Sequence, residues 1–93
     1  MDDLVRAFKA LGDENRLRIL AELNKGSCGV CRLAKALDMP QPTISHHLKI
    51  LREADLVLGE KEGPLVHCRV NHEGFKRRGI DLAMVLKEVA ESR

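Results

Sequence analysis

The chain has 93 residues, which predicts a single domain covering residues 1–93. Charged residues make up 32% of it and hydrophobic residues 44%, a composition that excludes disordered, collagen-like and coiled-coil chains. No apolar run approaches the roughly 18 residues of a membrane span. The acidic start Met1-Asp2-Asp3 is unlike a secretory signal, so we expect a cytoplasmic protein.

The formal net charge is +2, so a nucleic-acid function requires basic groups that are gathered locally. The chain has no Trp, no Tyr and 2 Phe, and therefore lacks the aromatic platform on which single strands stack. Double-stranded DNA is the better-matched partner. The 3 cysteines are an odd number, which argues against a secreted disulfide framework and favours free thiols.

Helical spacing of apolar residues dominates the first half of the chain. Gly12 stands where a helix end favours glycine, Asp13 is a good N-cap, and Pro42 is tolerated in the first turn of a helix. The predicted helices cover residues 4–11, 14–23, 30–37 and 41–52, and a tight turn joins the last two.

From residue 56 the apolar pattern becomes alternating. Residues 56–61 and 65–70 read as two strands of a hairpin around Glu62-Gly63-Pro64, and residues 72–92 return to helical spacing, with Gly79 weakening the first turns. This order predicts a winged helix-turn-helix, a mainly α fold with a small β-hairpin. In that fold the helix after the tight turn enters the major groove of DNA.

The segment from Pro40 to Arg52 contains no acidic residue, so nothing in it repels a phosphate. Its amide, hydroxyl and imidazole groups suit base edges, whereas its mobile cations suit phosphates. Taken alone, this polar face is also typical of an ordinary surface helix. The following hairpin favours DNA binding, because one of its faces is polar. The residues predicted to contact DNA are Gln41, Thr43, Ser45, His46, Lys49 and Arg52 on the helix, with Lys61 and Arg69 on the hairpin.

Two further residues are expected to be structural. His47 is displaced toward Ile44 and Leu51 on the apolar side of its helix, which favours a buried histidine that is hydrogen-bonded within the fold. Cys68 lies on the packed side of its strand and is predicted to be a small core residue.

Two stretches, LGDENRLRIL at 11–20 and QPTISHHLKILREADLV at 41–57, resemble the ArsR/SmtB family of bacterial metalloregulatory repressors. The pattern Gln-Pro-x-Ile-Ser-x-His-Leu in the second is specific. The resemblance implies a homodimeric winged-helix repressor, dimerised by its first and last helices, which leaves its operator when a toxic metal or metalloid binds.

The residues support dimerisation independently. The two ends of the chain carry more apolar surface than a small domain covers by itself. A two-fold dimer presents its reading helices about 34 Å apart and matches an inverted repeat in double-stranded operator DNA. The apolar residues concerned are Leu4, Val5, Phe8, Leu82, Val85, Leu86 and Val89.

Cys28 and Cys31 stand at the start of the third predicted helix. At this spacing the two thiols are expected on one side of a helical turn, where the helix N-terminus lowers a thiol pKa and favours binding of soft ions. In the resembled family a Cys-Val-Cys-Asp-Leu box at this place carries the ion. The resemblance therefore implies a thiophilic inducer bound by both cysteines: arsenic(III) or antimony(III), or alternatively cadmium, lead or zinc.

The chain departs from that box. Cys28 stands one position earlier than the first cysteine of the box, Arg32 replaces its acidic residue, and Ala34 replaces a cysteine found in some arsenic sensors. Trivalent arsenic prefers three thiolates. The third ligand is thus open among Cys68, an external small thiol and a group of the partner protomer.

Other functions remain as alternatives. The thiols of Cys28 and Cys31 also suit a repressor that senses oxidants or reactive sulfur. Alternatively, the two cysteines are small, partly buried structural residues, or they form a reversible disulfide. A winged-helix module used only for protein contacts is a further alternative. An enzyme is not expected, because no phosphate loop, carboxylate pair or nucleophile with a base is found.

Overall fold

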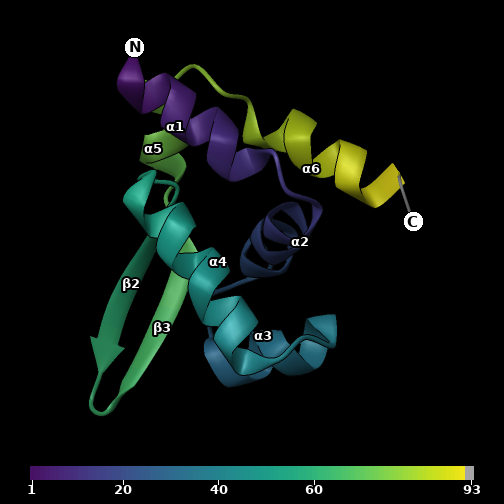
Figure 1. The fold of residues 1–93 in the computed structure, drawn as a ribbon, viewed down its shortest axis with the longest axis vertical. Coiled ribbons are helices and arrows are strands. Elements are labelled where there is room, and N and C mark those ends of the chain that lie inside the picture. Colours follow the sequence, from purple (N-terminus) through teal and green to yellow (C-terminus); the bar gives the residue numbers. More distant parts are fainter. Residues whose placement is uncertain (92–93) are drawn as a thin grey trace.

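The computed structural model describes residues 1–91 of the chain. Figure 1 shows α4 running through the middle of the molecule, with α1 and α6 at one end and α3 with the tip of the β2–β3 hairpin at the other. The elements are α1 (Asp2–Leu11), α2 (Glu14–Leu23), β1 (Cys28–Gly29), α3 (Val30–Leu37), α4 (Gln41–Glu53), β2 (Val57–Glu62), β3 (Leu65–Val70), α5 (His72–Arg77) and α6 (Leu82–Glu91).

The ends of the helices follow from local chemistry. The Asp13 side chain accepts a hydrogen bond from the Arg16 backbone N–H at 3.1 Å and so caps α2, as expected. Asp38 ends α3 in the left-handed region with φ 53°. Pro42 lies in the first turn of α4, where its missing N–H costs no hydrogen bond. The four predicted helices are confirmed, with bounds that shift by at most a few residues.

The sheet has three antiparallel strands in the order β1-β3-β2. The hairpin of β2 and β3 was predicted, and we call residues 57–70 the wing. The short strand β1 was not predicted, because two residues show no alternation. It pairs with the wing so that Cys28 lies opposite Cys68 and Gly29 lies opposite His67.

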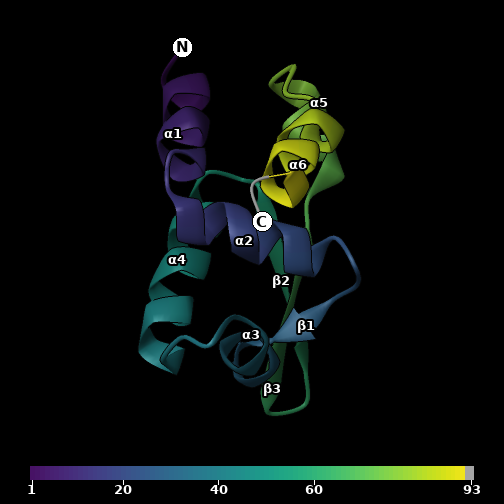
Figure 2. The same ribbon diagram turned by 90° about the vertical axis from the view of Figure 1, so that its right-hand side faces the viewer.

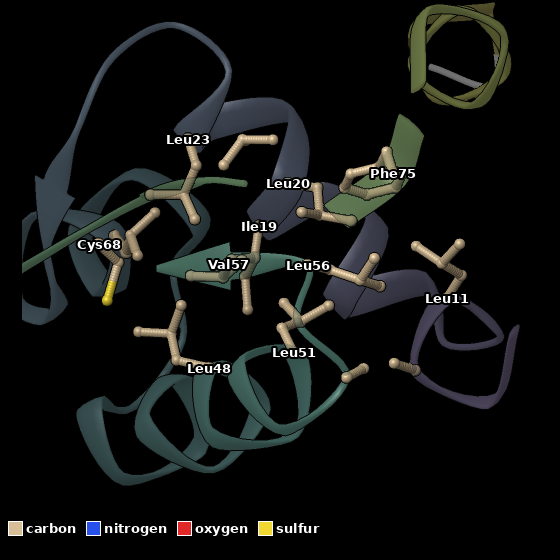
Figure 3. Packing of buried hydrophobic residues seen from close by; sticks show 14 of the residues in the cluster. Leu11, Ile19, Leu20, Leu23, Leu48, Leu51, Leu56, Val57, Cys68 and Phe75 are labelled. Carbon is tan, nitrogen blue, oxygen red and sulfur yellow. The ribbon is translucent and has the colours of Figure 1, made fainter. Parts of the chain in front are cut away.

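The hydrophobic core lies between the helices and the inner face of the sheet. Figure 3 shows Leu48 and Leu51 of α4 pointing toward Ile19 of α2 and Val57 of β2. Each of these side chains is buried, so the two helices and the wing share one packed interior. The prediction that Cys68 is a core residue is confirmed, since it is 2% exposed and belongs to this cluster.

The single helix predicted over residues 72–92 is wrong. The chain forms two helices there, α5 and α6, and Gly79 lies between them with φ +67°. This left-handed conformation favours glycine and cannot continue a helix. The break turns α6 across α2 (Figure 1). Ser92, the predicted end, lies outside the described residues.

Helices α1 and α6 lie at the same end of the molecule (Figure 2), and large apolar side chains of both are exposed. Phe8 of α1 is 57% exposed and Met84 of α6 is 68% exposed, and Leu4 and Val5 are also exposed. In residues 1–91 no helix is long and apolar enough to cross a membrane.

Candidate nucleic-acid interface and thiol site

The polar face predicted on α4 is present on the surface. The burial of Ile44, Leu48 and Leu51 fixes the rotation of the helix and turns the intervening side chains outward. Among the residues of α4 that are predicted to contact DNA, Thr43 is partly buried. The others are exposed: Gln41, Ser45, His46, Lys49 and Arg52.

The basic residues on and beside the wing lie in different environments. The Arg52 side chain of α4 lies close to the wing: a Cβ added at Gly59 would be 3.4 Å from the Arg52 Nη1 atom. Lys61 is exposed near the tip. Arg69 is exposed too, but its Nε donates a hydrogen bond to Glu60 at 2.6 Å. A phosphate would therefore have to compete with this carboxylate for Arg69.

His47 lies behind the polar face and joins α4 to the start of α2. The ring is buried, and Arg16 Nη1 lies 3.3 Å from its Nδ1 atom. Because a guanidinium only donates, Nδ1 accepts this bond and the neutral ring carries its proton on Nε2. Arg16 also donates to the backbone oxygens of Ala10 and Lys9. The structural role predicted for His47 is confirmed.

The same contacts shift two pKa values. Burial lowers the pKa of His47, and the charges of Arg16 and His46 lower it further, against an opposing effect of Asp13. For Asp13, burial raises the pKa, but the Arg16 backbone hydrogen bond and the charges of Arg16 and His47 outweigh it, so the pKa is lowered. We therefore expect a neutral His47 beside an ionised Asp13 at neutral pH.

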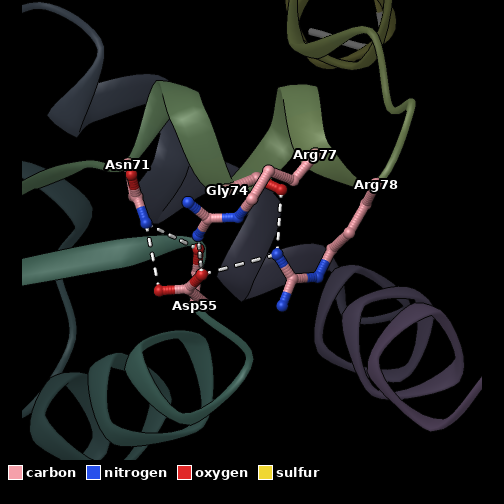
Figure 4. Close-up of polar contacts among 5 residues, drawn as sticks. All are labelled: Asp55, Asn71, Gly74, Arg77 and Arg78. Carbon is pink, nitrogen blue, oxygen red and sulfur yellow. Dashed lines mark hydrogen bonds and ion pairs between the residues drawn. The ribbon is translucent and has the colours of Figure 1, made fainter.

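A second polar cluster, centred on Asp55, fixes the other end of α4 (Figure 4). The Asn71 side-chain amide donates to the Asp55 backbone oxygen at 3.0 Å and to its carboxylate at 3.1 Å. Arg77 and Arg78 of α5 pair with the same carboxylate. A Cβ at Gly74 would lie 1.9 Å from the Asp55 oxygen, so only glycine fits there.

Sequence reasoning missed this Asp55 cluster. Its members belong to a turn and a short helix and share no periodic pattern, so spacing alone gives no signal. The one clue in the chain is Gly74 inside a helical stretch, where glycine usually has a packing reason. The cluster ties the C-terminal end of α4 to α5 and so helps to position the polar face.

The two cysteines of the predicted sensor are not on one helical turn. Cys28 lies in β1 and is 9% exposed, whereas Cys31 is exposed in the first turn of α3. Burial raises the pKa of the Cys28 thiol, with a further rise from Glu22 that Arg32 opposes. The expected lowering of the thiol pKa is therefore wrong for Cys28, because β1 places it in the sheet and not at the helix N-terminus.

Both cysteines nevertheless line one cleft, of about 400 Å³, between the start of α3 and the tip of the wing. We call it the thiol cleft. Within residues 1–91 no group of three His, Cys, Asp or Glu side chains is placed to hold a metal ion. Cys68, the third thiol, faces the core. The thiol cleft is lined by Ser27, Cys28, Gly29, Val30, Cys31, Arg32, Pro64, Leu65, Val66 and His67.

Comparison with known sequences places this geometry in a family. Residues 13–58 match the bacterial regulatory proteins of the arsR family. The arsenical resistance operon repressor of Escherichia coli is 47% identical over 68 residues, which cover 72% of this chain and 58% of that protein. The repressor of the same name from Staphylococcus xylosus is 38% identical over 71 residues, which cover 76% of this chain and 68% of that protein. The chain thus spans little more than half the length of the first of these relatives.

Solved structures give the same result. A homodimeric winged helix-turn-helix DNA-binding domain from Mycobacterium bovis, described as a possible ArsR-family transcriptional regulator, superposes with a TM-score of 0.79 at 32% identity. The match covers 99% of this chain and 82% of that chain. The predicted winged helix-turn-helix fold is confirmed. The chain belongs to the ArsR family of bacterial regulatory proteins.

Proposed function

We propose that the protein is a homodimeric transcriptional repressor that binds double-stranded operator DNA through α4 and the wing. The observation that carries this proposal is the exposed face of α4, which has no acidic residue between Pro40 and Arg52 and lies on a fully buried apolar stripe. Gln41 and Ser45 near the N-terminal end of α4 suit base edges, and Lys49 suits a phosphate. An ordinary surface helix has no need to exclude carboxylates.

The proposed dimer forms through α1 and α6. The exposed Phe8 and Met84 belong to these helices. Helices α1 and α6 lie at the opposite end of the molecule from α3 and the tip of the wing (Figure 2). Large exposed apolar side chains gathered at one end are typical of an interaction surface. The Mycobacterium bovis domain, which is described as homodimeric, supports the formation of a dimer. A two-fold axis there places two copies of α4 on an inverted repeat.

We propose further that a thiophilic inducer binds at Cys28 and Cys31 and releases the DNA. Arsenic(III) is favoured by the arsenical resistance operon repressors among the relatives. Antimony(III) is proposed beside it because it is equally thiophilic, and cadmium, lead and zinc are the alternatives. Cys28 belongs to a strand paired with the wing, and Cys31 belongs to the helix that precedes α4. An inducer that bridges the two cysteines shifts α3 relative to the wing. Because a tight turn joins α3 to α4, this shift also displaces α4. A coupling of about 1–3 kcal/mol is enough to change operator occupancy.

A titration of a labelled duplex from the upstream intergenic region tests this proposal. Arsenite is expected to release the native protein but not the Cys28→Ser, Cys31→Ser variant, because serine does not form the arsenic–sulfur bonds. The matched control Cys68→Ala removes the remaining thiol and is expected to keep the response. A normal response of the double variant would contradict the assignment of these cysteines.

Oxidant or reactive-sulfur sensing through the same thiols is less well supported. The thiolate is the species that oxidants attack, and burial raises the pKa of Cys28. We expect mass spectrometry after peroxide treatment to find adducts on the exposed Cys31 before Cys28. Rapid formation of a disulfide between Cys28 and Cys31 at neutral pH would favour redox sensing instead.

A further inference from the structure

We infer that Arg16 is a positioning residue for DNA binding, which joins α4 to the last turn of α1 and does so only while the His47 ring is neutral. Operator affinity therefore falls in acid, as this connection is lost. The inference rests on the proposed function, in which paired copies of α4 bind the operator. It adds a residue that acts on DNA binding through α4 and not by contact with the DNA.

The first argument is the set of acceptors around one guanidinium group. Arg16 Nε donates to the Ala10 backbone oxygen at 2.6 Å, and Nη2 donates to the Lys9 backbone oxygen at 3.3 Å. Both oxygens belong to the last turn of α1, where carbonyl groups lack regular helical partners and attract a cation. The remaining nitrogen, Nη1, lies 3.3 Å from Nδ1 of His47 in α4. The planar guanidinium thus bonds two helices at once, which the ammonium group of a lysine does not reproduce.

The second argument is the place of these two helices in the molecule. Helices α1, α2 and α4 pack against one another. The exposed Phe8 of α1 belongs to the proposed dimer surface, whereas α4 carries the polar face. The spacing of two α4 helices on successive turns of the operator therefore depends on how each α4 lies against its own α1. His46 and Lys49, which are predicted to contact DNA, are close neighbours of His47 on α4 and move with it.

The third argument is the chemistry of the His47 ring. A neutral ring accepts at Nδ1, but a protonated ring donates from both nitrogens and so cannot accept a bond from a guanidinium. The two positive charges also repel each other, and the ring is only 8% exposed, so little water screens them.

The ionisable groups around this ring lie on few elements. Burial lowers the pKa of His47; Asp13, just before α2, raises it, and Arg16 of α2 and His46 of α4 lower it. Within residues 1–91 no ionisable group of α1, α3 or the wing is among the groups that shift it. The bond between α2 and α4 therefore depends mainly on Asp13, Arg16 and the ring itself.

The direction of the effect follows from these contacts. Because the operator complex requires α4 in its bonded position, a protonated His47 must lose its proton when the protein binds DNA. Above the ordinary histidine pKa of 6.5 the ring is neutral and this term is absent; operator affinity falls as the pH drops through the lowered pKa of the folded protein. Protonation of the exposed His46 acts in the opposite direction, because a positive charge there attracts phosphates.

Titrations of the upstream duplex by fluorescence anisotropy, from pH 8.0 to pH 5.0 at one ionic strength, test the inference. The decisive variant is His47→Asn, whose side-chain oxygen lies near the position of Nδ1 and accepts the Arg16 bond at every pH. Relative to this variant, the native protein is expected to lose affinity at least about threefold across the range. The comparison cancels the effect of His46, which both proteins carry. His72→Asn, which removes an exposed histidine from α5, is the matched control and should keep the native pH profile.

A second pair of variants tests Arg16 itself. Arg16→Lys keeps a positive charge but not the bonds to both helices, so we expect it to weaken operator binding at pH 8.0 by at least about fivefold and to lose the fall in acid. The matched control is Arg18→Lys, since Arg18 of the same helix is exposed and pairs with Glu14 alone among the described residues. Circular dichroism and sedimentation verify that each variant is folded and dimeric at each pH.

The outcomes separate the inference from the proposed function. Identical pH profiles of the native protein and His47→Asn, or native affinity of a folded Arg16→Lys protein at pH 8.0, would overturn the inference and leave operator binding by α4 in place. Equal binding of the native protein to the upstream duplex and to a scrambled duplex at every pH would overturn both. If Arg16→Lys does not fold, the profile of His47→Asn decides the question alone.

Discussion

His47 of α4 is buried, and its ring accepts a hydrogen bond from Arg16 of α2, so this one residue ties two helices together. Its side of α4 was predictable because the apolar stripe is strongly periodic, and the structure places it beside Arg16 as a buried acceptor. The Asp55 cluster was not predictable, because its bonds join a turn to a helix that the pattern did not separate. The two thiols were only partly predictable. Cys31 lies at the start of the predicted third helix, whereas Cys28 lies in the strand β1, which was not predicted.

The buried His47 predicts a pH dependence of stability. Its pKa is lowered in the folded protein from the ordinary value of 6.5, so the unfolded chain binds the proton more tightly. Stability is therefore complete above pH 6.5 and falls as the pH drops toward the folded pKa, by at most about 1.4 kcal/mol per pH unit. Urea unfolding at pH 7.5 and 5.5 measures this. His47→Gln should remove this part of the dependence and the exposed His46→Gln should keep it; the same slope in both variants would contradict the assignment.

Gly74 gives a second prediction at this scale. Because a Cβ there would lie 1.9 Å from the backbone oxygen of Asp55, Gly74→Ala must displace α5 from the end of α4. We expect a loss of about 2–4 kcal/mol in the free energy of unfolding, measured by urea titration. The neighbouring Glu73→Ala, at an exposed position, is the control and should change stability little. A stable Gly74→Ala protein would show that this close approach is not required.

At the scale of the elements, the helices α2, α3 and α4 were predictable from spacing and caps. Two features were not. The strand β1 forms by pairing with β3, which is distant in the sequence, so no local sequence pattern indicates it. The break at Gly79 was hidden because apolar residues continue on both sides of it in helical spacing. Both features matter, since β1 places Cys28 and the break redirects α6.

The polar face of α4 predicts how binding should depend on salt. Lys49→Ala is expected to weaken binding to specific and unspecific duplexes alike and to reduce the slope of log affinity against log salt by about 1, because one phosphate contact is lost. Lys35→Ala, which removes an exposed cation from α3, is the matched control. Titrations by fluorescence anisotropy at several salt concentrations check this. An unchanged slope for Lys49→Ala would remove this residue from the interface.

At the scale of the whole molecule, the apolar end formed by α1 and α6 predicts the oligomeric state. Phe8 is 57% exposed in the single chain, and its burial in a dimer would contribute about 1.5–3 kcal/mol. Phe8→Ser should therefore shift the dimer toward monomer at micromolar concentration in analytical ultracentrifugation. Leu65→Ser, which changes a similarly exposed side chain on the wing, should remain dimeric. If both variants sediment as the native protein does, the dimer uses another surface.

The most direct test of the whole account is the binding of the native protein to a duplex that carries an inverted repeat from its own upstream region, compared with a duplex of scrambled sequence. We predict that two protomers bind the repeat, that the affinity falls steeply as salt rises, and that the repeat is preferred over the scrambled duplex by at least about a thousandfold. Equal affinity for both duplexes at every salt concentration would contradict the central claim that paired copies of α4 read DNA.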